Sequence, residues 1–289
     1  MGVIVSTRRT PRPGIALLVA GGLFAWTCAL ASIAVAIIMI GSVAGQGLAG
    51  IADFPTHVGV AVALAWSAGV VAAALPVATL VSFLASIAAA EDSLGDPLNV
   101  AVRAWLRIAP AVPSVLVGLA AAMVMTNAAR TAWVFSHPLL AAAAVLCALH
   151  LPVMTSRFRS VLRAVPARWR VGAAAAGSDV WSSYRTVIVP RALPGIVAVV
   201  LNAAGQMLGE TAAVAMLLAV SWPAAVVGEK PASMPLAVHI WLSLSGGARD
   251  ARIVAMSAAE LLALLAAIIV LRFAARLLLH RRRRAGAAA

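Results

Sequence analysis

Charged residues are scarce in this chain. Asp, Glu, Lys and Arg make up 11% of its 289 residues, whereas hydrophobic residues make up 63%. This scarcity excludes a soluble domain, because a domain of this length needs more polar side chains to cover its surface. Apolar runs of about 20 residues or more, the length of helix that crosses a bilayer, recur along the chain. Backbone groups in lipid must be satisfied within each segment, so these runs predict an all-α, polytopic membrane helical bundle.

Lysine and cysteine are almost absent. Lys230 is the only lysine, and it is followed by proline instead of the Ser or Thr of a P-loop. The chain therefore lacks the sequence with which P-loop proteins bind ATP, and no catalytic residue is predicted. Cys28 and Cys147 each lie within an apolar run and are interpreted as small core residues. No cofactor or metal is expected.

Basic residues give the chain a net charge of +13, and their placement orients it. Six spans are expected, at about 15–43, 58–90, 108–127, 136–155, 193–220 and 252–278. With these spans, eighteen of the 22 basic residues fall in segments on one side of the membrane and four on the other. Because Lys and Arg favour the cytoplasmic side, both termini are expected there, in a multi-pass protein of the cytoplasmic (inner) membrane. This pattern indicates lipid as a partner and argues against nucleic acid.

The chain is predicted to divide into three parts. Residues 1–14 form a cytoplasmic N-terminal segment, residues 15–280 a transmembrane domain and residues 281–289 a basic cytoplasmic tail. The first apolar stretch is longer than the roughly 7–15 residues of a signal-peptide core, so it is interpreted as a retained span. The outer stretch 234–244 is apolar but too short to cross, which favours a re-entrant or interfacial helix.

A long basic, amphipathic segment, 156–192, lies on the cytoplasmic side and has the pattern of a docking surface. Small residues at 173–176 make a helix face that another protein can approach closely. Gly177 suits the left-handed conformation of a helix C-cap. Asp179 suits the N-cap of a second short helix that carries Trp181. Two short helices at an angle are predicted here.

The same segment contains a spaced pattern. Small residues Gly172 and Ala173 are followed by Gly177 and then by Val187 to Pro190. This spacing resembles the signature loop of the integral-membrane permeases of binding-protein-dependent ABC importers. The resemblance implies an importer-permease fold and an ATPase-docking loop that includes Gly172, Ala173, Gly177, Asp179, Trp181, Val187 and Pro190. Val171 stands where the family has a glutamate, so one polar contact with the ATPase is expected to be missing.

Further motifs narrow the resemblance to phosphate-importer permeases. PSVLVG (113–118) and GETA (209–212) resemble motifs of these permeases, and RALPGI (191–196) and MPLAVHIW (234–241) resemble the A-type subunit in particular. The GETA stretch is also similar to C-type subunits. The resemblance implies a permease subunit of an ATP-driven importer of inorganic phosphate, with ATP hydrolysis on a separate subunit. The implied partners are a homologous permease in a heterodimer, a pair of ATP-binding subunits and an extracytoplasmic phosphate-binding protein.

Glu210 is the residue that most needs an explanation, because it lies inside the apolar run MLGETAAVAML (207–217). A charge near the centre of a bilayer costs about 2.5–3.5 kcal/mol on insertion scales and usually marks a pathway. The predicted translocation pathway comprises Pro113, Ser114, Gln206, Gly209, Glu210 and Thr211. Because a carboxylate repels phosphate, the pathway needs a cation partner or a protonated glutamate. Where the resembling permeases commonly have an arginine, this chain has Gln206, so the partner subunit is expected to supply the anion ligand.

Alternatives to this interpretation remain open. Glu210 could merely cap a helix or pair with another span, near His150 or His239. Glu260 is expected to reach the interface or to pair with Arg252. The cargo could be another oxyanion such as molybdate or tungstate, an alternative that Gln206 motivates. A protein of another class, an ATP-independent secondary transporter, would couple to protons or sodium through one of the two glutamates.

Overall fold

The computed structural model describes residues 15–50, 58–90, 96–128, 137–221, 234–247 and 250–287. Within these ranges the secondary structure is helical and contains no strand, which confirms the all-α prediction. Five helices are long and apolar enough to cross a membrane, and a sixth span results if the bent pair Val100–Ala111 and Ser114–Met125 is counted as one. The N-terminal segment 1–14 lies outside the described residues.

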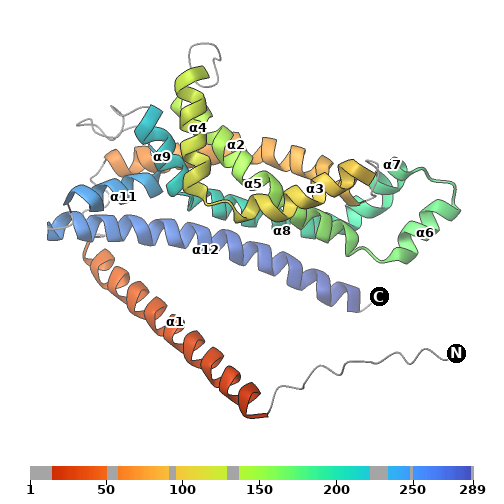
Figure 1. Ribbon diagram of the computed structural model, residues 1–289, viewed down its shortest axis with the longest axis horizontal. Coiled ribbons are helices and arrows are strands. Elements are labelled where there is room, and N and C mark those ends of the chain that lie inside the picture. The colour runs from red at the N-terminus through yellow and green to blue at the C-terminus, as the bar shows by residue number, and fades with distance from the viewer. Residues whose placement is uncertain are drawn as a thin grey trace, which may run out of the picture.

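Most of the helices run roughly along one long axis, the helix at residues 114–128 stands across it, and two short helices project at one end (Figure 1). In chain order they are α1 (Ile15–Gly50), α2 (Val58–Ala90), α3 (Asp96–Ile108), α4 (Ser114–Ala128), α5 (Pro138–Arg163), α6 (Ala167–Ala175), α7 (Val180–Ser183), α8 (Val189–Leu208), α9 (Ala212–Ser221), α11 (Leu236–Gly247) and α12 (Ala251–Ala287). A 3₁₀ turn, Ala109–Ala111, follows α3, and a π-helical turn, Tyr184–Ile188, joins α7 to α8.

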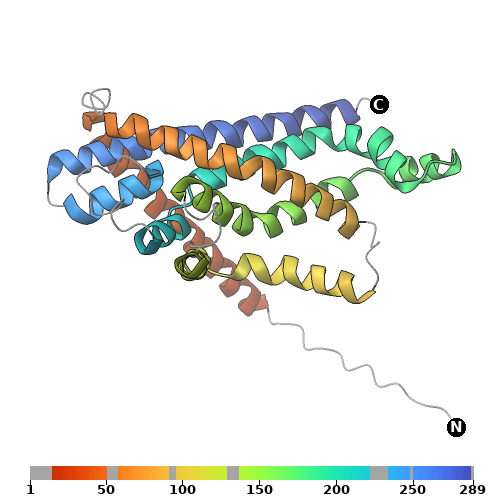
Figure 2. The ribbon, with the colours of Figure 1, turned by 90° about the horizontal axis from the view of Figure 1, so that it is seen from above.

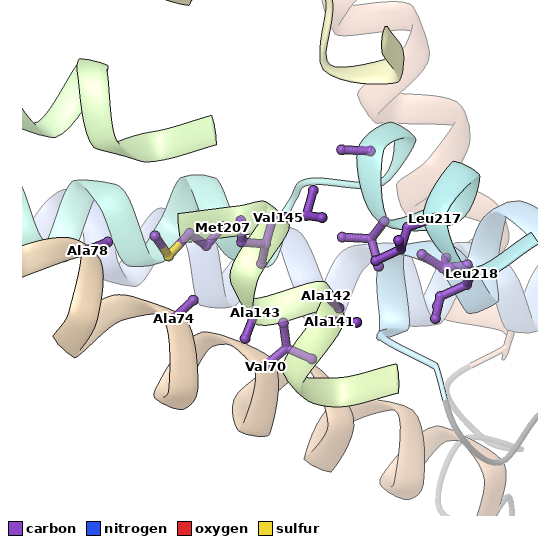
Figure 3. Close-up of a cluster of buried hydrophobic side chains, with 14 of the residues drawn as sticks. Val70, Ala74, Ala78, Ala141, Ala142, Ala143, Val145, Met207, Leu217 and Leu218 are labelled. Atoms are coloured by element: carbon purple, nitrogen blue, oxygen red, sulfur yellow. The ribbon is translucent and has the colours of Figure 1, made fainter. Parts of the chain in front are cut away.

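Small residues hold the centre of the bundle together. Ala74 and Ala78 of α2 and Ala141–Ala143 of α5 are buried in one apolar cluster, to which α8 adds Met207 (Figure 3). In lipid, where hydrophobic burial between helices gains little, close backbone approach through small side chains supplies the van der Waals contact. The Ala-rich composition therefore permits tight helix packing.

The first helix, α1, leaves the bundle obliquely and packs along α12 (Figure 1). Its residues from Trp26 to Ile40 are all exposed in the single chain, as expected for a helix that faces lipid. Contact with α12 is closest at Gly47, where a Cβ atom would lie 3.0 Å from the carbonyl carbon of Ala258.

The region of the third span differs from its prediction. Residues 96–108, expected as part of a loop, form the helix α3, and α4 follows at an angle of 103°. The bend lies at Pro110 and Pro113, which lack the backbone N–H groups that a continuous helix would use. The polar residues of α3 lie on one face, a pattern typical of helices at the membrane surface.

The short apolar stretch expected as a re-entrant or interfacial helix is α11. It packs inside the bundle, since Leu236, Ala237 and Ile240 are buried. The Oγ atom of Ser67 on α2 accepts a hydrogen bond of 2.7 Å from the N–H of Leu236, which satisfies one backbone donor at the buried start of α11. A buried helix start with such a partner is more typical of a re-entrant segment than of a surface helix.

Glu260 on α12 does not have the environment that was expected. It is 2% exposed, and its Oε2 atom lies 3.0 Å from Nδ1 of His239 on α11. The expectation that it reaches the interface or pairs with Arg252 is therefore wrong. The sequence places His239 in an outer loop. Because α11 enters the bundle, His239 lies beside Glu260.

The contact between α4 and α9 generates a prediction about stability. A Cβ atom at Gly118 would lie 2.7 Å from the Cα atom of Ala213, which is closer than real Cβ contacts. Gly118→Ala should therefore push the two helices apart and lower the free energy of unfolding by about 1–3 kcal/mol. Thermal unfolding of the purified chain in detergent measures the effect.

Gly41→Ala is the matched control, since a Cβ atom at Gly41 on α1 meets nothing within 4 Å. Alanine favours helix over glycine by about 1 kcal/mol, so this variant should be neutral or slightly more stable. Equal melting temperatures for the two variants would contradict the close contact between α4 and α9.

Candidate functional site

The fifth expected span is broken at its glutamate. The helix α8 ends at Leu208 and α9 begins at Ala212, so Gly209, Glu210 and Thr211 separate two helices. The N–H of Gly209 donates to the carbonyl of Gln206 at 3.2 Å, and the carbonyl of Thr211 accepts from Ala215 at 2.8 Å. The prediction of one uninterrupted helix for 193–220 is therefore wrong. Non-helical backbone at membrane depth is tolerated where it is buried in protein or lines a water-filled cavity.

Glu210 caps the helix that follows the break. Its Oε1 atom accepts a hydrogen bond of 3.4 Å from the N–H of Ala213, in the first turn of α9. The amino end of a helix carries a partial positive charge, which stabilises a nearby carboxylate. This contact stabilises a carboxylate within an apolar segment without the help of a basic side chain.

The break borders an open cavity of about 570 Å³. Its walls come from α5, α8, α12 and the bend between α3 and α4, and its lining residues are Ala109, Pro110, Val112, Ser114, Leu149, His150, Val153, Arg157, Gly205, Gln206, Gly209, Glu210, Ile268 and Arg272. Four of the expected pathway residues, Ser114, Gln206, Gly209 and Glu210, are brought together here. Pro113 lies at the bend and Thr211 at the break, but neither borders the cavity.

Two arginines in the cavity wall were not expected there. Arg157 of α5 donates from Nη1 to Oε1 of Gln206 at 3.2 Å, and Arg272 of α12 lines the same cavity. Both were counted among the basic residues of the cytoplasmic side, Arg157 beyond the end of the expected span 136–155 and Arg272 near the end of the span 252–278. In the structure α5 continues to Arg163 and α12 to Ala287, so both arginines remain on helices that wall the cavity. Helical spacing was the available signal, since Arg157 follows His150 by seven residues, about two turns.

The imidazole of His150 in the cavity wall has a local partner. Nδ1 of His150 lies 2.9 Å from the carbonyl oxygen of Leu146, so this nitrogen carries the proton and donates it. His150 does not reach Glu210 through this nitrogen. His239 is paired with Glu260 instead, so the proposed pairing of Glu210 with His239 is wrong. Among the described residues, no group of three or more His, Cys, Asp and Glu side chains could hold a metal ion.

The charged groups of the cavity lining are mainly basic. Its charged lining consists of two guanidinium groups and one carboxylate, which gives a positive balance. A guanidinium group presents several N–H donors in a plane, and this arrangement matches the oxygens of phosphate and related oxyanions.

The expected docking segment projects from one end of the bundle, the end at which α12 finishes (Figures 1 and 2). Gly177 has φ +77° and follows α6, as its C-cap interpretation requires. Asp179 caps α7 by accepting a hydrogen bond of 3.3 Å from the N–H of Ser182. Trp181 is exposed at 59%. Two short helices are thus present, and the second continues through the π-helical turn directly into α8.

Within the docking segment, Gly172 and Pro190 are exposed, Val187 is half-buried and Ala173 is buried. Arg170 ties α6 to the bundle, because it donates to the carbonyl of Leu162 at 3.0 Å and to the hydroxyl of Tyr184 at 3.4 Å. These contacts make α6 and the π-helical turn one packed unit.

Comparison with known proteins agrees with this architecture. Residues 82–284 match the family described as binding-protein-dependent transport system inner membrane component. The chain is 27% identical over 189 residues to the probable ABC transporter permease protein YqgI of Bacillus subtilis, covering 61% of this chain and 63% of that protein. It is 32% identical over 184 residues to the phosphate transport system permease protein PstC 1 of Mycobacterium tuberculosis, covering 53% of each.

It is also 32% identical over 111 residues to PstA 1 of the same organism, covering 38% of this chain and 36% of that protein. The chain thus spans between about a third and two thirds of the length of these curated relatives. Because the family match extends over most of the chain and the helices are those of a multi-pass membrane protein, the chain belongs to the binding-protein-dependent inner membrane transport components and is a transport protein, not an enzyme.

Proposed function

We propose that the chain is a permease subunit of an ATP-driven importer that moves inorganic phosphate across the cytoplasmic membrane. The observation that carries the proposal is the helix break at Glu210, which opens onto a cavity walled by two arginines. The phosphate transport names of two relatives and the GETA and PSVLVG motifs add support.

The chemistry of Glu210 favours phosphate over molybdate or tungstate. A carboxylate repels an oxyanion, but it accepts a hydrogen bond from one that carries a hydroxyl group. Inorganic phosphate retains a hydroxyl group at neutral pH, whereas molybdate and tungstate do not. A cavity with two guanidinium donors and one carboxylate acceptor therefore suits phosphate better than a fully ionised oxyanion.

The energy for the conformational change of the helices would come from other subunits. A pair of ATP-binding subunits would dock on the projecting segment 167–188 and hydrolyse ATP, and a homologous permease would complete the pathway. An extracytoplasmic binding protein would deliver phosphate on the opposite face. The docking segment, the N-terminal segment 1–14 and the tail 281–289 would then share the cytoplasmic side. ATP-driven closure of the partner dimer would rock the helices between inward and outward openings.

A competition experiment tests the proposed function. Cells that express the chain with its own partner subunits should accumulate radiolabelled phosphate, and excess molybdate or tungstate should inhibit this uptake only weakly. Uptake should also require the ATP-binding subunit, which separates the importer from an ATP-independent transporter. Phosphate uptake that is absent, or that persists without any ATP-binding subunit, would overturn the proposal.

The carboxylate of Glu210 should be required for transport. Glu210→Gln keeps the shape of the side chain but removes the charge that the amino end of α9 stabilises. Phosphate uptake should fall about tenfold, equivalent to 1.4 kcal/mol, while membrane insertion and partner assembly stay normal. Uptake equal to the wild type would reduce Glu210 to a structural cap.

The left-handed backbone at Gly177 should be required for coupling. Gly177→Val places a β-branched side chain at φ +77°, a conformation that such residues adopt only with strain. Phosphate-stimulated ATP hydrolysis by the reconstituted transporter should be lost. Gly45→Ala is the control, because it adds a methyl group to the helical backbone of α1, outside the docking segment, with nothing within 4 Å, and it should keep the stimulation. Full stimulation in Gly177→Val would argue against docking at this segment.

A further inference from the structure

We propose that Arg157 and Arg272 form the oxyanion-binding site of this chain, with Gln206 holding Arg157 toward the cavity. The inference rests on the proposed function and deepens it, because it names the side chains that receive the anion. It also replaces the expectation that a partner subunit supplies the ligand that Gln206 cannot provide.

The direction of Arg157 differs from that of the arginines near it on α5. Arg159 donates to the carbonyl of Ala89 at 3.0 Å, and Arg163 donates to the carbonyl of Ala90 at 3.1 Å. Both therefore face the carboxyl end of α2, where a helix carries partial negative charge. Arg157 instead reaches across to Gln206 on α8. Residues two positions apart on a helix do not face the same way, so Arg157 lies on another face of α5 than Arg159, the face that borders the cavity.

The contact with Gln206 leaves Arg157 able to bind a ligand. A guanidinium group has five N–H donors, and the hydrogen bond to Gln206 uses one of them. Among the described residues, the side chain of Gln206 is the hydrogen-bond partner of the Arg157 side chain. Arg157 lines the cavity, so its other donors can reach an anion there. The side-chain oxygen of Gln206 orients the guanidinium group without neutralising it.

Arg272 supplies the second positive charge from α12. Arg157 and Arg272 line the same cavity, so both guanidinium groups border the space that an anion would occupy. Two like charges in one cavity wall repel each other, and an anion between them removes this repulsion. Glu210 lines the same cavity, but its Oε1 atom is engaged by the N–H of Ala213 on α9. The arrangement lacks a full counter-charge for the two arginines, and an oxyanion of charge −1 or −2 supplies it.

The geometry also explains how a positive charge is provided although position 206 is Gln instead of Arg. In the resembling permeases the cation commonly stands on the same helix as the glutamate, four residues before it. Here the guanidinium group of Arg157 comes from α5 and lies 3.2 Å from the side chain at position 206. The positive charge is thus kept at nearly the same place while its helix of origin has changed.

The test uses the complete transporter with its partner subunits. Arg157→Gln and Arg272→Gln should each raise the KM for phosphate uptake at least about tenfold, equivalent to 1.4 kcal/mol of lost binding. Arg157→Gln removes the charge and keeps a polar, uncharged side chain at this position. The matched controls are Arg159→Gln on α5 and Arg276→Gln on α12, neither of which lines the cavity, and both should keep the wild-type KM.

A double variant that relocates the charge distinguishes loss of anion binding from a purely structural effect. Arg157→Gln combined with Gln206→Arg moves the guanidinium group to the other side of the 3.2 Å contact and should restore a KM close to that of the wild type. If Arg157→Gln fails to assemble, Arg272→Gln decides, because Arg272 is exposed in the single chain and tolerates replacement.

The outcomes separate this inference from the proposed function. Phosphate uptake with an unchanged KM in Arg157→Gln and Arg272→Gln would overturn the arginine site and leave phosphate import standing. A wild-type transporter that takes up molybdate instead, and loses that uptake in the same variants, would support the arginine site and overturn phosphate as the cargo. Failure of the relocation variant, once assembled, to recover any uptake would count against the site.

Discussion

The structure depends on one constraint, which is that backbone N–H and C=O groups inside a bilayer must find partners within the protein or in a cavity that holds water. Long helices meet this requirement along most of the chain, and small residues let them pack without gaps. Within the described part of the chain, the backbone is irregular at the bend of residues 109–113 and at the break of residues 209–211, and both border the same cavity. Irregular backbone therefore occurs where it borders the cavity, and the cavity can hold the water that satisfies the free backbone groups.

The break also explains how an acidic side chain is accommodated. A continuous helix would satisfy all of its own N–H groups and leave Glu210 without a donor, whereas the start of a new helix at Ala212 exposes backbone donors beside the carboxylate. The stabilisation of about 0.3–1 kcal/mol typical of an acidic group at a helix start offsets part of the cost of the charge. The capping contact and a place in the pathway are compatible roles, because the same residue both caps α9 and lines the cavity.

Much of this architecture could be predicted from the sequence, because apolar length and charge placement report directly on membrane spans. The docking segment was also predictable, since Gly177 and Asp179 have local roles that neighbouring residues fix. The break at Glu210 was not, because three residues scarcely change the mean hydropathy of a window long enough to cross the bilayer. The pairing of Glu260 with His239 depends on α11 entering the bundle, which is a tertiary event. The place of Arg157 and Arg272 in one cavity wall was not predictable, because it depends on how α5, α8 and α12 pack together.

The position of α8 connects the two functional regions. Its amino end follows the π-helical turn of the docking segment without an intervening loop, and its carboxyl end lies at the break. A helix of 20 residues is about 30 Å long, so one nearly rigid element joins the docking surface to the cavity. Arg170 and Tyr184 fix the amino end to α5, and Gln206 meets Arg157 of α5 near the other end. If the proposed docking segment were displaced, the contacts of α5 with α8 at both ends would move these two walls together, while the break separates α9 from α8.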